Sequence, residues 1–289
     1  MGIPIYIPSR SRVDRMGVLE QLSDNRLYDT HIIVPESQHP EYEKKITDEW
    51  NEPLPVVIPT PDYWKIGEVR QSCALHAYNN GHRHFLMIDD DIRFLIRQDI
   101  DDWRLREASI EEVDSMIEWM HLRMINTRGL TLTSVSPREG NNRPGVGGPD
   151  DLFVMQQRIH RVYMWNVDEF LKLEHLRVTV AEDFDLALQT LRRGNQIGMS
   201  YYWGQGQRTT QDTGGASDYR TLEVHNASVQ RLAELHPGFV RVVDKQNKSG
   251  GELASRKESV ISWQAAAEEG MRTRFAAKAF ANRVVESQD

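Results

Sequence analysis

Three consecutive aspartates, Asp89, Asp90 and Asp91, are the residues whose type and spacing most clearly indicate chemistry. They follow the apolar run 85–88, so a buried strand would end directly at three carboxylates. Side chains two positions apart on a strand share a face, which places Asp89 beside Asp91. Two neighbouring carboxylates repel each other unless a cation lies between them, and a hard divalent ion prefers such oxygen ligands. The pattern predicts a Mg²⁺ or Mn²⁺ site that would balance a diphosphate leaving group.

The alternative for the triplet is an acidic turn after a strand. Single aspartates are common in such turns, but three in a row after a fully apolar strand are costly without a counter-ion. A second acidic pair, Glu182 and Asp183, stands at the start of a helix predicted over 183–193. The helix dipole alone would favour carboxylates there. We favour Asp183 as a catalytic base, because a rigid element would fix its geometry, with Glu182 as the next candidate.

Basic residues follow the first predicted strand. Backbone amides in the turn at Pro8 and Ser9 could meet a nucleotide, and Arg10 or Arg12 could make forked contacts to phosphate. The other interpretation is a plain turn with solvated arginines. Arg70, in a helix that precedes the triplet, could reach the nucleotide or could lie on the surface. We assign all five to nucleotide binding, together with Asp89 and Asp90.

Two histidines and one tryptophan complete the candidates. His225 is our choice for a third metal ligand beside Asp89 and Asp91, and His236 is the alternative. Neither has metal-ligand spacing by itself, and an isolated histidine is more often structural. Trp203 borders a polar, glycine-rich segment and could stack on a sugar, although burial is the commoner role of aromatic residues.

The elements that must position these residues alternate between strands and helices in the first half of the chain. This order predicts an α/β fold with a mostly parallel sheet covered by helices on both faces. In that half we expect strands over 3–7, 30–34, 55–58 and 84–88 and helical segments over 13–22 and 64–80. In the second half we expect helices over 111–126, 167–173, 183–193, 222–235 and 260–285, strands over 130–135, 161–165, 196–202 and 239–243, and loops over 137–149 and 204–219.

Composition restricts the function classes. The chain has 289 residues, 39% of them hydrophobic, which suffices for one large domain with an appendage. The net charge of −8 weighs against a protein that holds nucleic acid by bulk electrostatics, although it leaves room for a local basic groove. With one cysteine, Cys73, and neither a signal peptide nor an apolar membrane span, we expect a cytoplasmic protein.

Four segments resemble motifs of the GT-A nucleotide-sugar glycosyltransferases, which have a Rossmann-like fold. Residues 5–12 resemble the first strand and nucleotide-binding turn, 64–80 the helix before the metal motif, 89–91 the Asp-x-Asp motif, and 181–188 the acidic motif that opens the acceptor-side helix. The resemblance implies a UDP-sugar donor, a metal at Asp89 and Asp91, and Asp183 as the base of an inverting enzyme. We expect a GT-A domain over 1–250, with a nucleotide-sugar half over 1–135 and an acceptor half over 136–250, and a C-terminal helical extension over 251–289.

Within that fold the chain is most similar to the phage TET-associated glycosyltransferase group. The similarity rests on the short Pro-Ser-Arg opening, the spacing to the triplet, the Glu-Asp helix, and Gly214-Gly215 with Arg220. It implies that the acceptor is hydroxymethylcytosine in phage DNA and that the enzyme works in the host cytoplasm. Ser11 departs from the family pattern, because a glycine is frequent there.

Three other functions stay open from the sequence. The chain could be a nucleotidyltransferase acting on a sugar phosphate, but such enzymes usually have a glycine-rich loop after the first strand, and 9–12 contains no glycine. It could glycosylate a glycan or a protein instead of DNA. It could also be a nucleotide-sugar-binding module without turnover, against which the intact triplet and acidic pair argue.

Overall fold

The computed structural model confirms the α/β fold. It describes residues 2–23, 28–50, 54–141, 145–207, 219–246 and 255–286, with side chains as far as residue 277. Within these residues, ten strands form one mixed, mostly parallel sheet. Its order is β3 (Val56–Thr60), β2 (Asp29–Pro35), β1 (Pro4–Pro8), β4 (His84–Ile88), β9 (Val162–Asn166), β7 (Leu130–Pro137), β10 (Gln196–Gln207), β5 (Ile92–Asp99) and β6 (Asp102–Glu107), with β8 (Phe153–Met155) beside β10.

The strand directions bring several carboxyl ends to one edge of the sheet. Strands β3, β2, β1 and β4 are parallel neighbours, and β7 is parallel to β10. Strand β9 is antiparallel to both β4 and β7, so these two groups point the same way. The ends of β1, β4, β7 and β10 therefore share the edge at which ligands bind in open α/β sheets.

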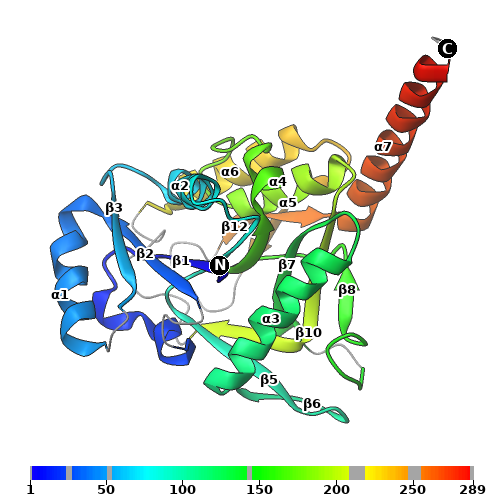
Figure 1. The fold of residues 1–289 in the computed structure, drawn as a ribbon. Coiled ribbons are helices and arrows are strands. Elements are labelled where there is room, and N and C mark those ends of the chain that lie inside the picture. The colour runs from blue at the N-terminus through cyan, green and yellow to red at the C-terminus, as the bar shows by residue number, and fades with distance from the viewer. Residues whose placement is uncertain are drawn as a thin grey trace.

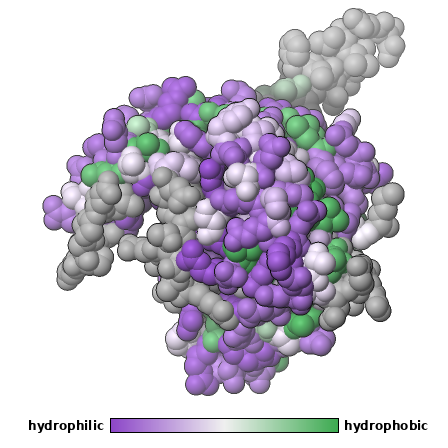
Figure 2. Space-filling view, turned by 90° about the vertical axis from the view of Figure 1, so that its left-hand side faces the viewer, coloured by the Kyte–Doolittle hydropathy of each residue, from purple (hydrophilic) through white to green (hydrophobic). Residues whose placement is uncertain are grey.

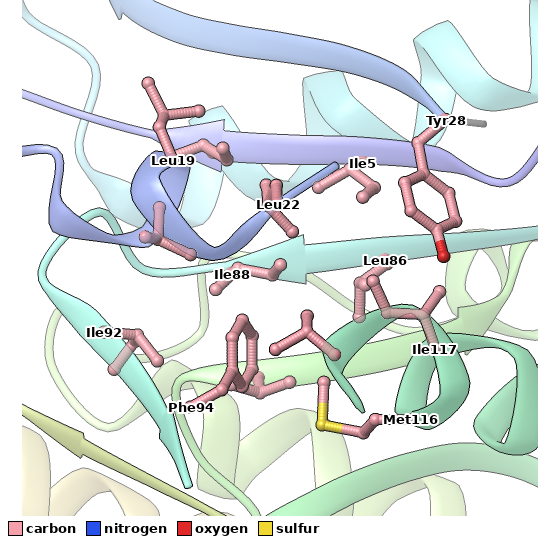
Figure 3. Close-up of a cluster of buried hydrophobic side chains, with 14 of the residues drawn as sticks. Ile5, Leu19, Leu22, Tyr28, Leu86, Ile88, Ile92, Phe94, Met116 and Ile117 are labelled. Atoms are coloured by element: carbon pink, nitrogen blue, oxygen red, sulfur yellow. The ribbon is translucent and has the colours of Figure 1, made fainter. Parts of the chain in front are cut away.

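Helices cover both faces, as expected, because the buried strands alternate between two cores. In β4, Leu86 and Ile88 face one core, while Phe85 and Met87 face the other. Figure 3 shows the first core, where Met116 and Ile117 of a helix lie over β4 and β5. The elements on this face are η2 (Gly17–Gln21), α1 (His39–Glu49) and α3 (Ile110–Asn126). Those on the other face are α2 (Ile66–Asn79), α4 (Val167–Leu171), α5 (Glu182–Arg192), α6 (Leu222–Leu235) and α7 (Trp263–Glu286).

Local sequence signals explain where several helices begin. Ser109 and Glu112 form a reciprocal capping box at the start of α3, each side chain bonding the other's backbone amide. The side chain of Thr221 accepts from Val224 at the start of α6. Both helices then follow their predicted ranges closely.

Four predicted details differ from the structure. The segment 13–22 forms two short 3-10 helices, η1 (Val13–Arg15) and η2, instead of one helix. Helix α1 and the β5–β6 hairpin were not predicted. Strand β10 continues to Gln207, so the predicted loop over 204–219 is wrong for its first four residues. The rest of that loop, from 208 to 218, lies outside the described residues.

The last part of the chain contains more than a helix. Strand β12 (Ser255–Ile261) pairs antiparallel with β11 (Val240–Gln246) to form a separate two-stranded sheet. Helix α7 then packs on α5 so closely that a Cβ at Gly270 would meet the Leu191 carbonyl oxygen at 1.9 Å. Beyond this contact α7 projects from the body (Figure 1). The proposed boundary at residue 250 stays a prediction.

The surface on the side of α1 and β3 is mainly hydrophilic, with hydrophobic residues singly or in small groups (Figure 2). In the described part of the chain, helices are either too short or too polar to cross a bilayer.

Candidate active site

The aspartate triplet lies directly after β4, next to the turn that follows β1. The Ser9 hydroxyl donates to Asp90 Oδ2 at 2.5 Å, and Arg12 Nη1 lies 2.9 Å from Asp90 Oδ1. Asp90 is only 3% exposed, and Tyr42 of α1 contacts the same Ser9 hydroxyl at 2.8 Å. The buried bond between Ser9 and Asp90 therefore fixes the turn after β1 beside the triplet. We had assigned both residues to nucleotide binding, but their positions are supporting ones.

Asp91 and Asp89 are the more accessible members. Arg12 Nη1 also lies 2.9 Å from Asp91 Oδ2, and Gln207, at the end of β10, donates to the same carboxylate at 3.1 and 3.2 Å. Asp89 has one long contact, 3.5 Å to Arg70 Nη2, and its side chain is 30% exposed. Burial, with the charges of Asp91 and Asp90, raises the pKa of Asp89 to about 7, although Arg70 opposes the shift. The shift means that burial makes the charged form of this carboxyl less favourable than it is in water.

Arg70 joins the triplet to the acidic end of α5. Its Nη1 lies 2.6 Å from Glu182 Oε1, while its Nη2 faces Asp89. The guanidinium also lies over the Tyr163 ring, 4.7 Å from the ring centroid. Arg70 is 6% exposed, which excludes the alternative of a surface arginine. Through this one side chain, residues that are far apart in the sequence belong to one cluster.

Asp183 belongs to the same cluster. The Tyr163 hydroxyl donates to Asp183 Oδ2 at 3.1 Å, and the backbone amide of Phe184 donates to Oδ1 at 3.0 Å. The side chain is only partly buried. Its orientation is thus fixed by neighbours while part of the carboxylate remains open.

Three non-glycine residues around this edge have a left-handed backbone. They are Ser11 at φ 57°, Arg161 at φ 70° and Ala181 at φ 66°. Such a conformation costs a non-glycine residue about 1–2 kcal/mol. Ser11 stands where the resemblance led us to expect a glycine, and its positive φ is a conformation that glycine adopts at lower cost. Arg161 accepts from the Asp89 amide at 3.0 Å, and Ala181 precedes the first residue of α5, so the strained backbone adjoins the acidic residues.

The remaining nucleotide candidates lie at the same edge. Pro8 ends β1. Arg10 donates to the backbone oxygens of Trp64 and Asp62, at 3.1 and 2.9 Å, and so organises the segment between β3 and α2. Trp203 is 4% exposed in the hydrophobic core, so the prediction that it stacks on a sugar is wrong.

The geometry also speaks against His225 as a metal ligand. Its Nε2 donates to the Lys257 carbonyl at 2.8 Å, and its Nδ1 faces Arg220 Nη2 at 3.4 Å. His236 is likewise committed, since its Nε2 contacts Asp185 Oδ1 at 2.7 Å and Arg192 donates to its Nδ1 at 3.2 Å. In both histidines, the two ring nitrogens face protein atoms. These buried side chains therefore link secondary structure elements in the interior.

The carboxylates of Asp89 and Asp91 fit a divalent cation that takes its remaining ligands from a substrate. Mg²⁺ is typically bound by one or two carboxylates, with phosphate oxygens and water completing its shell. Asp89 and Asp91 provide two carboxylates, and burial, with a smaller contribution from the neighbouring carboxylates, raises the pKa of Asp89. Among the described residues, His, Cys, Asp and Glu side chains form no group of three that could hold a metal. A cation here would therefore depend on phosphate ligands.

Three residues of the cluster were missed by the sequence reasoning: Tyr163, Gln207 and Tyr42. Tyr163 is in a predicted strand, but nothing local indicates that its hydroxyl reaches Asp183. Gln207 was assigned to a loop, and Tyr42 lies in the unpredicted helix α1. Gly214-Gly215, which is part of the family resemblance, lies outside the described residues.

Comparison with solved structures found similar chains. The chain is similar to S. aureus TarS 1-349, with a TM-score of 0.44 and 12% identity over 81% of this chain and 66% of that one. It is also similar to a structure described as a nucleotide-diphospho-sugar transferase from Desulfovibrio desulfuricans G20, with a TM-score of 0.33 and 11% identity over 58% of this chain and 65% of that one. The chain thus spans slightly less than two-thirds of each of these structures.

No curated protein sequence matches the chain. The family model described as TET-Associated Glycosyltransferase matches residues 3–216, a range that contains the first turn, the triplet and the acidic start of α5. The chain therefore belongs to the TET-associated glycosyltransferase family.

Proposed function

We propose that this glycosyltransferase moves a hexose from a UDP-sugar to an acceptor hydroxyl, with inversion at the anomeric carbon, and that the acceptor is hydroxymethylcytosine in DNA. One observation carries the proposal. Arg70 contacts Asp89 of the triplet and Glu182 at the start of α5, which brings the candidate donor carboxylates and the candidate base into one cluster. A glycosyl transfer needs the group that stabilises the leaving diphosphate to lie close to the group that takes the acceptor proton.

On the donor side, the turn after β1 and the triplet would bind the diphosphate. Asp89 and Asp91 would hold Mn²⁺ or Mg²⁺, and the bound metal would neutralise charge on the UDP leaving group. Arg12 already spans Asp90 and Asp91, so its guanidinium is positioned to move toward a phosphate. Asp90 and Ser9 would keep the turn in place while the donor binds.

On the acceptor side, Asp183 would accept the proton of the attacking hydroxyl. The hydrogen bonds from the Tyr163 hydroxyl and the Phe184 amide hold its carboxylate in one orientation. A positioned base typically contributes about 10²–10⁴-fold to the rate. Glu182 Oε1 lies 2.6 Å from Arg70 Nη1, so part of its carboxylate is already bound by the protein.

For the acceptor, the family membership favours DNA, whereas the net charge of −8 opposes it. Arg138, exposed after β7, is our candidate for a phosphate contact. If DNA is the acceptor, the rate should fall steeply with added salt, since phosphate contacts release counterions. Arg138→Ala should then reduce the slope of log rate against log salt by about one. A rate insensitive to salt would indicate a small or uncharged acceptor.

The direct experiment is incubation with a panel of UDP- and GDP-sugars and hydroxymethylated DNA, followed by mass spectrometry of the digested nucleosides. The expected result is a nucleoside heavier by one hexose, with release of UDP. Unmodified DNA is the matched control, because it lacks the acceptor hydroxyl. Pyrophosphate release would instead indicate a nucleotidyltransferase, and UDP binding without turnover would indicate a binding module.

A further inference from the structure

Tyr163 is a buried polar side chain beside the candidate base. It lies in β9, opposite Met87 of β4, and is 3% exposed. Its ring therefore belongs to the core beneath the site, while its hydroxyl reaches the edge where α5 begins. A tyrosine in such a place combines a fixed ring with one directed hydrogen-bond donor.

The contacts of Tyr163 leave little freedom for its hydroxyl. The guanidinium of Arg70 lies over the ring, and the O–H donates to Asp183 Oδ2 at 3.1 Å. Arg70 is itself held by Glu182, the residue before Asp183. The ring, the guanidinium and the two acidic side chains thus form a closed arrangement around the start of α5.

We infer that Tyr163 is a positioning residue for glycosyl transfer, holding the Asp183 carboxylate in the orientation needed to accept the acceptor proton. The inference rests on the proposed function, since it requires Asp183 to be the base. The tyrosine hydroxyl bonds Oδ2 and the Phe184 amide bonds Oδ1, so the remaining lone pairs of the carboxylate are held in one orientation. A donated hydrogen bond also favours the charged form of a carboxylate.

The environment keeps the tyrosine proton in place. Burial, and to a smaller extent the charge of Asp183, raises the pKa of Tyr163 well above its ordinary value, against the opposing charge of Arg70. The hydroxyl therefore remains a donor at every pH at which the enzyme could work. An ionised phenolate would repel Asp183, so the direction of this shift suits a permanent donor.

The test is Tyr163→Phe, which removes the hydroxyl and retains the ring under Arg70. A hydrogen bond to a charged group corresponds to about 10- to 100-fold. We expect kcat for UDP-sugar turnover to fall by about that factor, with KM for the donor within about two-fold. Tyr28→Phe is the matched control, since it removes a hydroxyl bonded to the Asp114 carbonyl in the other core (Figure 3).

The double variant with Asp183→Asn separates positioning from general stability. If Tyr163 acts through Asp183, adding Tyr163→Phe to Asp183→Asn should lower kcat no further. A kcat within two-fold of wild type for Tyr163→Phe, or an equal loss in both backgrounds, would overturn the inference. Full activity of Asp183→Asn would contradict the base assignment itself, and that failure is recognised from the single variant alone.

Discussion

Helix α5 carries carboxylates in two contrasting environments. Asp185, on its inner side, is 2% exposed and accepts hydrogen bonds from Arg177, His236 and Gln189. Although burial alone would raise the pKa of Asp185, these partners lower it below its ordinary value. At the start of the same helix and in the adjoining triplet, the carboxylates have fewer partners, and the pKa of Asp89 is raised.

The difference separates stability from function. A buried carboxylate with its bonds satisfied fixes the packing of α5 against neighbouring elements. A carboxylate whose pKa is raised by burial makes the fold less stable when it is ionised, and perturbed groups of this kind are concentrated at functional sites. The two environments lie within a few residues of each other, so substitutions along one helix can distinguish them.

The largest expected effect concerns the functional end. Asp183→Asn should lower turnover by about 10²–10⁴-fold, because a positioned base is lost, while donor affinity changes little. Steady-state kinetics with a UDP-sugar and thermal melting of the same preparations would check this. With an α-linked donor, the wild-type product should be β-linked. An α-linked product would instead require a retaining mechanism.

The second effect concerns the structural end. Asp185→Ala should lower the free energy of unfolding by about 1–3 kcal/mol, since the buried His236 loses its hydrogen-bond partner and the half-buried Arg177 loses an ion pair. Turnover per folded molecule should stay near that of wild type, because Asp185 faces away from Asp183. Urea unfolding and active-site titration would measure the two quantities. A loss of turnover without a loss of stability would reverse the roles that we assign.

A smaller effect is expected from pH. The folded pKa of Asp185 is lowered, whereas in the unfolded chain it is about 3.9. The carboxylate therefore contributes its stability above about pH 4, and that contribution is lost as the pH falls through the folded pKa. The difference in unfolding free energy between wild type and Asp185→Ala should be full at pH 7 and smaller at pH 3. A constant difference would show that charge is not its cause.

The fold was predictable where local pattern and burial agree. The apolar run before Asp89 predicted β4, and the amphipathic pattern before Gly194 predicted α5. Helix α1 was missed because only Tyr42 and Ile46 of its residues are buried, so it has almost no apolar stripe. In β5, Ile92, Phe94 and Ile96 do alternate with other residues, and this signal could have identified the hairpin.

The site was predictable as a set of residue types but not as a set of contacts. Asp89, Arg70 and Glu182 were selected from separate motifs, and their ion pairs depend on strand order, which no local pattern specifies. His236 was a candidate metal ligand, but it is a core residue that pairs with Asp185, 51 residues away in the sequence. Tyr163 could not be identified for the same reason, since its hydroxyl contacts a residue of a helix that begins 19 residues later.

The central claim is that the aspartate triplet binds a nucleotide diphosphate through a cation. Thermal melting with UDP, in Mn²⁺ or Mg²⁺ and in chelator, tests it most directly. We expect UDP to raise the melting temperature when the metal is present and to have little effect in chelator, and we expect Asp91→Asn to lose the metal-dependent part while remaining folded. An equal shift in chelator, or an undiminished metal-dependent shift in Asp91→Asn, would contradict the account.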